Sequence, residues 1–152
     1  MNPVIFSRQS DEWSTPQYLF DALDVEFTFG LDAAATETNA KCTAFFTAED
    51  DALTQDWCVL ARPWSIFVNP PYSQCRAFVH KAAESAKYGA QVVMLLPART
   101  DTRWFHDHIW DAEHACPRTR VEVRFLKGRL RFGEAQNSAP FPSMIVIFRP
   151  HV

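Results

Sequence analysis

Residues 66–72, Ile-Phe-Val-Asn-Pro-Pro-Tyr, place an apolar run directly before an asparagine, two prolines and a tyrosine. A short apolar run of this kind is typical of a buried β-strand. Proline fixes φ at about −65° and also restrains the residue before it, so Asn69 and Pro70 are both expected to be held extended. The stretch therefore predicts a strand that ends in a stiff loop of fixed geometry.

The stiff loop offers hydrogen-bond acceptors beside a flat aromatic ring. Because proline has no N–H, the backbone carbonyls of Asn69 and Pro70 lack local donors and can point at a ligand. The side-chain oxygen of Asn69 adds another acceptor, and Tyr72 offers a π face over the same spot. A planar ring that carries an exocyclic NH₂ group meets these demands, and a purine or pyrimidine amine fits.

Helix-like and strand-like segments alternate on both sides of this loop. Helices are predicted at 16–23, 76–88 and 102–113, and strands at 27–31, 66–68, 92–97 and 143–148. The stretch 121–132 alternates like a β-hairpin around Lys127-Gly128. The pattern predicts an α/β fold, a doubly wound and mostly parallel sheet with a C-terminal β-hairpin, in which ligands bind outside the carboxyl ends of the strands.

The composition is that of one soluble domain. The chain has 152 residues, of which 47% are apolar and 14% aromatic, and we expect a single domain over 1–152 with a flexible segment at 1–11. The longest apolar runs fall far short of the roughly 20 residues that cross a bilayer, and 1–11 lacks a signal-peptide core. A cytoplasmic location without membrane association is therefore expected.

The cysteines and histidines predict neither disulfides nor a metal site. The four cysteines never occur as Cys-x-x-Cys and are interpreted as reduced thiols. His106, His108, His114 and Cys116 lie close together in the sequence but match no zinc template.

A net charge of −3 gives no overall attraction to nucleic acid, so any DNA contact must come from a local basic patch. The predicted hairpin carries such a patch. Lys127, Arg129 and Arg131 suit a ribbon that follows a phosphate backbone, and Phe132 could support displaced bases. The alternative is a solvated hairpin face without function.

Asn-Pro-Pro-Tyr after a strand resembles the catalytic loop of the amino-methyltransferases that use S-adenosylmethionine. In that family the motif [Asn/Asp/Ser]-Pro-Pro-[Tyr/Phe] serves methylation of adenine N6, cytosine N4 and some glutamine amides. The stretches "EWSTPQYLFDAL", "LDAAATETNAKCTAFF", "DDALTQDW", "VVMLLPARTDTRWFH" and "FLKGRLRF" follow one another much as in the phage-type, Dam-like DNA N6-adenine methyltransferases. The resemblance covers about residues 12–149.

This resemblance implies a Rossmann-like fold and a site-specific transfer of a methyl group from S-adenosylmethionine to adenine N6 in DNA, by an enzyme of a phage or prophage. The implied catalytic residues are Asn69, Pro70, Pro71 and Tyr72. Asn69 Oδ1 and the Pro70 carbonyl would accept the two N6 hydrogens, and Tyr72 would stack on the flipped base.

The resemblance also implies a set of cofactor residues. Trp13, Thr15 and Pro16 would close over the methionine end of the cofactor, and Asn69 would border it. Asp32 would begin the cofactor loop, Asp50 or Asp51 would accept bonds from the ribose hydroxyls, and Asp56 would bind the adenine amine. The usual Phe-x-Gly-x-Gly is absent, and "LDAAAT" stands in its place.

Several alternatives stay open at this point. Asp32 could cap a following helix, the acidic residues could belong to a solvated loop, and Trp13 could be a core residue. At the level of function, the rivals are methylation of cytosine N4, RNA or protein glutamine, and a nucleic-acid-binding module of the same fold without catalysis.

Overall fold

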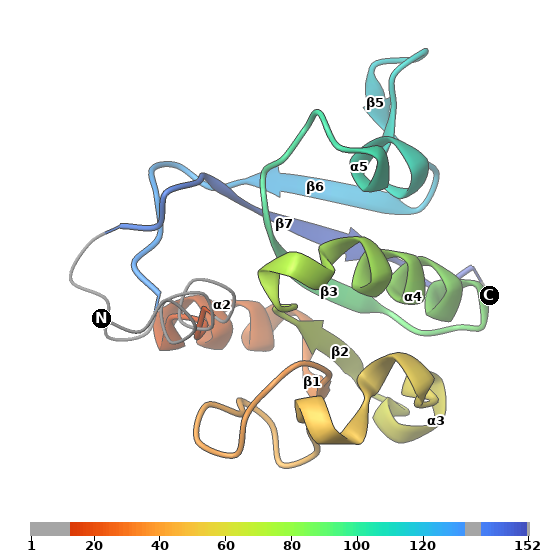
Figure 1. The fold of residues 1–152 in the computed structure, drawn as a ribbon. Helices are drawn as coiled ribbons and strands as arrows, with labels where there is room; N and C mark the ends of the chain where they lie inside the picture. Colours follow the sequence, from red (N-terminus) through yellow and green to blue (C-terminus); the bar gives the residue numbers. More distant parts are fainter. Residues whose placement is uncertain (1–12, 133–137, 152) are drawn as a thin grey trace.

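A five-stranded mixed sheet forms the centre of the protein (Figure 1). The computed structural model describes residues 13–132 and 138–151; the segment 1–11, predicted to be flexible, lies outside them. The strand order is β1-β2-β3-β7-β6, in which β1, β2 and β3 are parallel and β7 runs antiparallel to both β3 and β6. The strands are β1 (Phe29–Asp32), β2 (Ser65–Val68), β3 (Val92–Pro97), β6 (Val121–Phe125) and β7 (Ser143–Phe148).

Helices cover both faces of this sheet. One face packs against α3 (Trp57–Ala61), α4 (Cys75–Lys87) and α5 (Arg103–His108), and the other against α2 (Gln17–Phe27) (Figure 1). Successive residues of a strand point to opposite faces, so Met94 joins the α4 side while Val93 joins the α2 side. All six residues of β3 are buried, which explains its continuous apolar sequence and confirms the α/β class.

The predicted helices and strands differ from the structure mainly at their ends. The helix expected at 102–113 ends at His108, and a small ribbon of β4 (Trp110–Asp111) and β5 (Cys116–Pro117) follows. The acidic stretch before Trp57 contains the 3-10 turns η1 (Ala48–Asp50) and η2 (Ala52–Thr54), and α3 starts at Trp57. Within the described residues, no helix is long and apolar enough to cross a membrane.

The predicted hairpin around Lys127-Gly128 was wrong. The chain does bend at Gly128, which has φ of +73°, but β6 has already ended at Phe125 and pairs with β7 along its whole length. Residues 129–132, which follow the bend, join no strand; instead Leu130 and Phe132 are buried against the α2 side of the sheet. Burial of these two apolar side chains outweighs the local hairpin pattern.

The sheet brings two loops together at one edge. Because β1 and β2 are adjacent and parallel, their carboxyl ends lie at the same edge of the sheet. Asp32 is the last residue of β1, and Asn69 follows the last residue of β2. The amide of Ala33 donates to the carbonyl of Phe67 at 3.0 Å and so ties the two strand ends together.

Candidate active site

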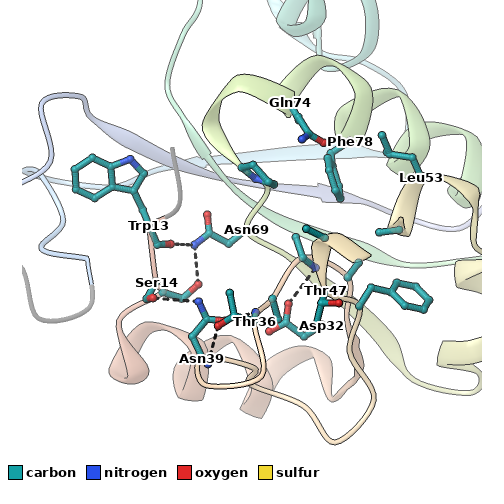
Figure 2. Close-up of a pocket in the computed structure, with 18 of the residues that line it drawn as sticks. Trp13, Ser14, Asp32, Thr36, Asn39, Thr47, Leu53, Asn69, Gln74 and Phe78 are labelled. Atoms are coloured by element: carbon teal, nitrogen blue, oxygen red, sulfur yellow. Dashed lines mark hydrogen bonds between the residues drawn. The ribbon is translucent and has the colours of Figure 1, made fainter. Parts of the chain in front are cut away.

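A cavity opens where β1 and β2 end, and Figure 2 shows the residues around it. It holds about 840 Å³ of empty space, a figure that includes open solvent at its mouth. Its walls come from the segment before α2, the loop after β1, the turns before α3, the loop after β2 and the start of α4. Three stretches that are distant in the sequence, within 13–15, 32–53 and 69–78, therefore share one site.

The cavity brings together six of the residues predicted from the sequence. These are Trp13, Thr15, Asp32, Asp51, Asn69 and Pro71. The remaining residues predicted to bind cofactor or to act in catalysis, Pro16, Asp50, Asp56, Pro70 and Tyr72, are not among its lining residues.

The side chain of Asn69 is held by the segment before α2. Its Nδ2 donates to the carbonyl oxygen of Trp13 and, at 3.0 Å, to Oγ1 of Thr15. A backbone carbonyl can only accept, so the NH₂ end of the amide must face Trp13 and the oxygen must face away. No described residue donates to Asn69 Oδ1, which remains available as an acceptor.

The same segment is tied to the loop after β1. Ser14 Oγ accepts from Asn39 Nδ2 at 3.2 Å, and Asn39 Oδ1 accepts from the amide of Thr36 at 2.7 Å (Figure 2). Sequence reasoning missed Ser14, Thr36 and Asn39. The only available signal was Thr-x-x-Asn at 36–39, a spacing that suits local turn bonding.

Asp32 is a buried carboxylate on the cavity wall, with 3% of its surface exposed. It accepts from the amides of Lys41 at 3.0 Å and Ala34 at 3.3 Å. Burial raises its pKa to about 6, although these two bonds act in the opposite direction. No helix follows Asp32 directly, because residues 33–47 form turns and bends, so the helix-cap alternative was wrong.

The three other acidic candidates differ in their surroundings. Asp50 Oδ2 accepts from the amide of Thr47 at 2.8 Å in a capping box. Asp56 is the N-cap of α3 and accepts from the amide of Val59 at 3.1 Å, away from the cavity. Asp51 lines the cavity, and none of the described residues bonds its carboxylate. Of the three, Asp51 is therefore the one placed to meet a ligand.

The ring of Tyr72 is supported on one side and bonded at its tip. Phe141 stacks on it with ring centroids 5.2 Å apart and planes at 27°. The guanidinium of Arg99, in the loop after β3, donates to the Tyr72 hydroxyl. Phe141 also contacts Trp13, with ring centroids 5.9 Å apart, so the aromatic packing joins the loop after β2 to the segment before α2.

The three prolines predicted for the site, Pro16, Pro70 and Pro71, differ in where they lie. Pro16 is buried as the N-cap of α2, and its carbonyl accepts from the amides of Leu19 and Phe20. Pro70 is buried behind the loop, while Pro71 faces the cavity. Both prolines thus restrain the backbone of the loop that carries Asn69.

The residues proposed to contact DNA divide into two groups. Lys127, Arg129 and Arg131 are exposed, and no ion pair engages them in the part of the chain that the structure describes. Phe132 is buried, with 5% exposed, and packs on Trp13 with ring centroids 5.4 Å apart. The assignment of Phe132 as a support for displaced bases is therefore corrected: the ring belongs to the core.

None of the four cysteines, all of which lie within the described residues, is in a disulfide. Cys75 is buried at the start of α4, and Cys58 donates to the carbonyl of Ser85. Burial raises the pKa of Cys42 to about 12, so this thiol stays protonated near the cavity.

Residues 5–152 match the model of one protein family, described as DNA N-6-adenine-methyltransferase (Dam). The chain belongs to this family. The DNA N-6-adenine-methyltransferase of Haemophilus phage HP1 is 33% identical over 143 residues, which are 92% of this chain and 79% of that protein. The protein of the same name from Escherichia phage T1 is 40% identical over 96 residues, 62% of this chain and 39% of that protein.

A third relative is bacterial. The putative methyltransferase YfdM of Escherichia coli (strain K12) is 42% identical over 65 residues, which are 41% of this chain and 71% of that protein. The family match and the phage relatives agree with the resemblance to the Dam-like DNA N6-adenine methyltransferases.

Proposed function

We propose that this Dam-family protein methylates N6 of adenine in DNA, with S-adenosylmethionine as the methyl donor and Asn69 as the residue that holds the reacting amine. The family and its phage relatives support adenine in DNA as the substrate. One observation supports the role of Asn69: no described residue donates to its Oδ1 at the edge of a cavity, while its Nδ2 is bound on the other side.

The residues of the cavity fit S-adenosylmethionine. The buried carboxylate of Asp32 offers negative charge to a cationic ligand, and Asp51 offers an acceptor for hydroxyl groups. Ala33, Ala34 and Ala35 keep the loop after β1 small, so a ligand can approach the backbone although the glycine-rich loop is absent. The apolar side chains Phe46, Leu53 and Phe78 suit a ring system. When bound, the cofactor supplies a methyl group already activated by its sulfonium.

The protein's own contribution is to position and polarise the amine. Adenine N6 is a weak nucleophile because its lone pair is delocalised into the ring. Acceptance of its two hydrogens by Asn69 Oδ1 and the Pro70 carbonyl would keep electron density on nitrogen and fix its direction. No group of the enzyme needs to become covalently attached to the base.

Tyr72 provides the surface for the base. Adenine N6 is paired inside a duplex, so the nucleotide has to flip out, at a cost of a few kcal/mol. Phe141 covers one face of the Tyr72 ring and Arg99 holds its hydroxyl. We propose that the flipped adenine stacks on the opposite face, with Phe141 behind the ring.

The exposed bend after β6 is proposed to contact the DNA backbone. Lys127, Arg129 and Arg131 are free of ion pairs to the described residues, in a protein of net charge −3. The helices on both faces of the parallel strands β1–β3 support a Rossmann-like methyltransferase fold as the frame of this arrangement.

Methylation of a defined DNA duplex, followed by nucleoside digestion and mass spectrometry, tests this function. N6-methyladenine is the expected product, and its formation should require S-adenosylmethionine. N4-methylcytosine, or methyl transfer only to RNA or to protein glutamine, would refute the substrate assignment. Calorimetric titration with S-adenosylmethionine separates an enzyme from a binding module of the same fold, since a protein that does not bind the cofactor cannot transfer its methyl group.

A further inference from the structure

The segment 13–15, just before α2, controls which end of the Asn69 amide faces the substrate. The two ends of an asparagine side chain have nearly the same shape but opposite hydrogen-bonding character. Asn69 Nδ2 contacts the Trp13 carbonyl and Thr15 Oγ1 at the same time. A half-turn of the amide would bring its oxygen against the Trp13 carbonyl oxygen, so the bonding partners select one orientation.

The Thr15 hydroxyl is built into this contact. Thr15 is buried, with 5% of its surface exposed, and its Oγ1 lies 3.0 Å from Asn69 Nδ2. Pro16 follows as the N-cap of α2, which restrains Thr15 to extended backbone. The position of the hydroxyl is therefore set by the backbone and by burial.

The segment is anchored on its other side as well. Ser14 Oγ accepts from Asn39 Nδ2, and Asn39 in turn bonds to Thr36 in the loop after β1 (Figure 2). Segment 13–15 thus lies between the loop that ends β1 and the loop that ends β2. Both loops line the same cavity.

We propose that segment 13–15 is a clamp that orients the catalytic amide, with Thr15 as the positioning residue and Asn39 as the anchor of the clamp. This inference rests on the proposed function of Asn69. In this proposal Thr15 orients the Asn69 amide that holds the reacting amine, and its role is not limited to a contact with the cofactor.

Steady-state kinetics of three variants test the clamp. Thr15→Val removes the hydroxyl and keeps the shape, Thr15→Ser keeps the hydroxyl, and Thr119→Val is a matched control on an exposed threonine. We expect Thr15→Val to lower kcat by roughly 5–30-fold, with the KM for DNA and the Kd for S-adenosylmethionine nearly unchanged. Thr15→Ser should restore most of the rate, and Thr119→Val should match the wild type.

A second variant probes the anchor without touching Thr15. Asn39→Asp loses the donor to Ser14 but keeps the acceptor for the Thr36 amide. Asn39→Asp should also lower kcat, but by a smaller factor than Thr15→Val. A valine variant with wild-type kcat, or a serine variant as slow as valine at equal melting temperature, would overturn the role of Thr15.

A spectroscopic readout keeps the clamp testable if methyl transfer itself is not observed. In a ¹H–¹⁵N spectrum, the side-chain amide signals of Asn69 are identified as the pair that disappears in Asn69→Ala. Its hydrogens should exchange slowly with water in the wild type and in Thr15→Ser, and faster in Thr15→Val. Equal exchange in all three would refute the clamp, whereas slow exchange in a protein without N6-methyladenine product would refute only the proposed function.

Discussion

Asn69 donates to the hydroxyl of Thr15 over 3.0 Å, across 54 positions of sequence. Together with the bond to the Trp13 carbonyl, this contact turns Asn69 Oδ1 away from segment 13–15, and no described residue donates to this oxygen. We propose that catalysis depends on this one oxygen. The surrounding residues matter because they hold it, shape the cavity beside it or bring the DNA to it.

Asp51 and Asp56 form a matched pair for cofactor binding. Asp51→Ala should weaken S-adenosylmethionine binding by about 1–2 kcal/mol, because Asp51 lines the cavity and no described residue bonds to its carboxylate. Asp56→Ala should leave affinity unchanged and lower the free energy of unfolding by about 1 kcal/mol, because it removes the N-cap of α3. Calorimetry and chemical denaturation check both. The reverse pattern would place the cofactor nearer to Asp56.

Asp32 should make cofactor binding depend on pH. Its pKa is raised to about 6 by burial, so the carboxylate is ionised above this pH and becomes neutral below it. Affinity for the cationic cofactor should therefore fall as the pH drops from 7 to 5, and Asp32→Asn should remove this dependence and bind more weakly at pH 7. Titrations at several pH values test it, and a wild-type affinity that is constant between pH 5 and 7 would exclude a charge contact from Asp32.

The Tyr72 hydroxyl should matter because it accepts from Arg99. Tyr72→Phe keeps the stacking ring but frees it at the tip, so we expect kcat/KM to fall roughly two- to tenfold. Arg99→Ala should cost about as much, and the double variant should be little worse than either, since both remove one interaction. Arg103→Ala controls for the loss of one positive charge. Additive losses would show that Arg99 acts independently, for example on phosphate.

Substitutions in the bend after β6 should have two different effects, because Arg129 and Arg131 are exposed and Phe132 is buried. Arg129→Ala and Arg131→Ala should each reduce the slope of log affinity against log salt by about 1, if each arginine neutralises one phosphate of duplex DNA. Phe132→Ala should instead lower stability by about 3–5 kcal/mol, because the ring is buried against Trp13 and Phe141. DNA titrations across a salt series and thermal unfolding measure the two effects. Unaltered slopes in both arginine variants would return this bend to a solvated surface.

Part of the fold could be predicted from local sequence alone. The strand at 65–68 and the stiff loop after it follow from an apolar run and two prolines, and both were predicted. The buried strands β3 and β7 were likewise predicted from their continuous apolar sequences.

Features that depend on distant partners could not be read from the chain. The pairing of β6 with β7 replaced a hairpin that looked favourable locally, because β7 offers a long, fully buried neighbour. The bond between Ser14 and Asn39 joins residues 25 positions apart, and neither residue has an unusual local pattern. Asp56 looks the same in sequence whether it caps a helix or binds a ligand, and only its bond to Val59 distinguishes the two.

Single-turnover methylation of a defined duplex by the wild type and by Asn69→Ala is the most direct test of the central claim. With enzyme and S-adenosylmethionine in excess, the rate of N6-methyladenine formation reports the transfer step. We expect Asn69→Ala to lower this rate by about 10²–10³-fold, the range for loss of a group that stabilises a transition state, with cofactor affinity and melting temperature close to those of the wild type. A variant that transfers methyl groups within a few-fold of the wild-type rate would contradict it.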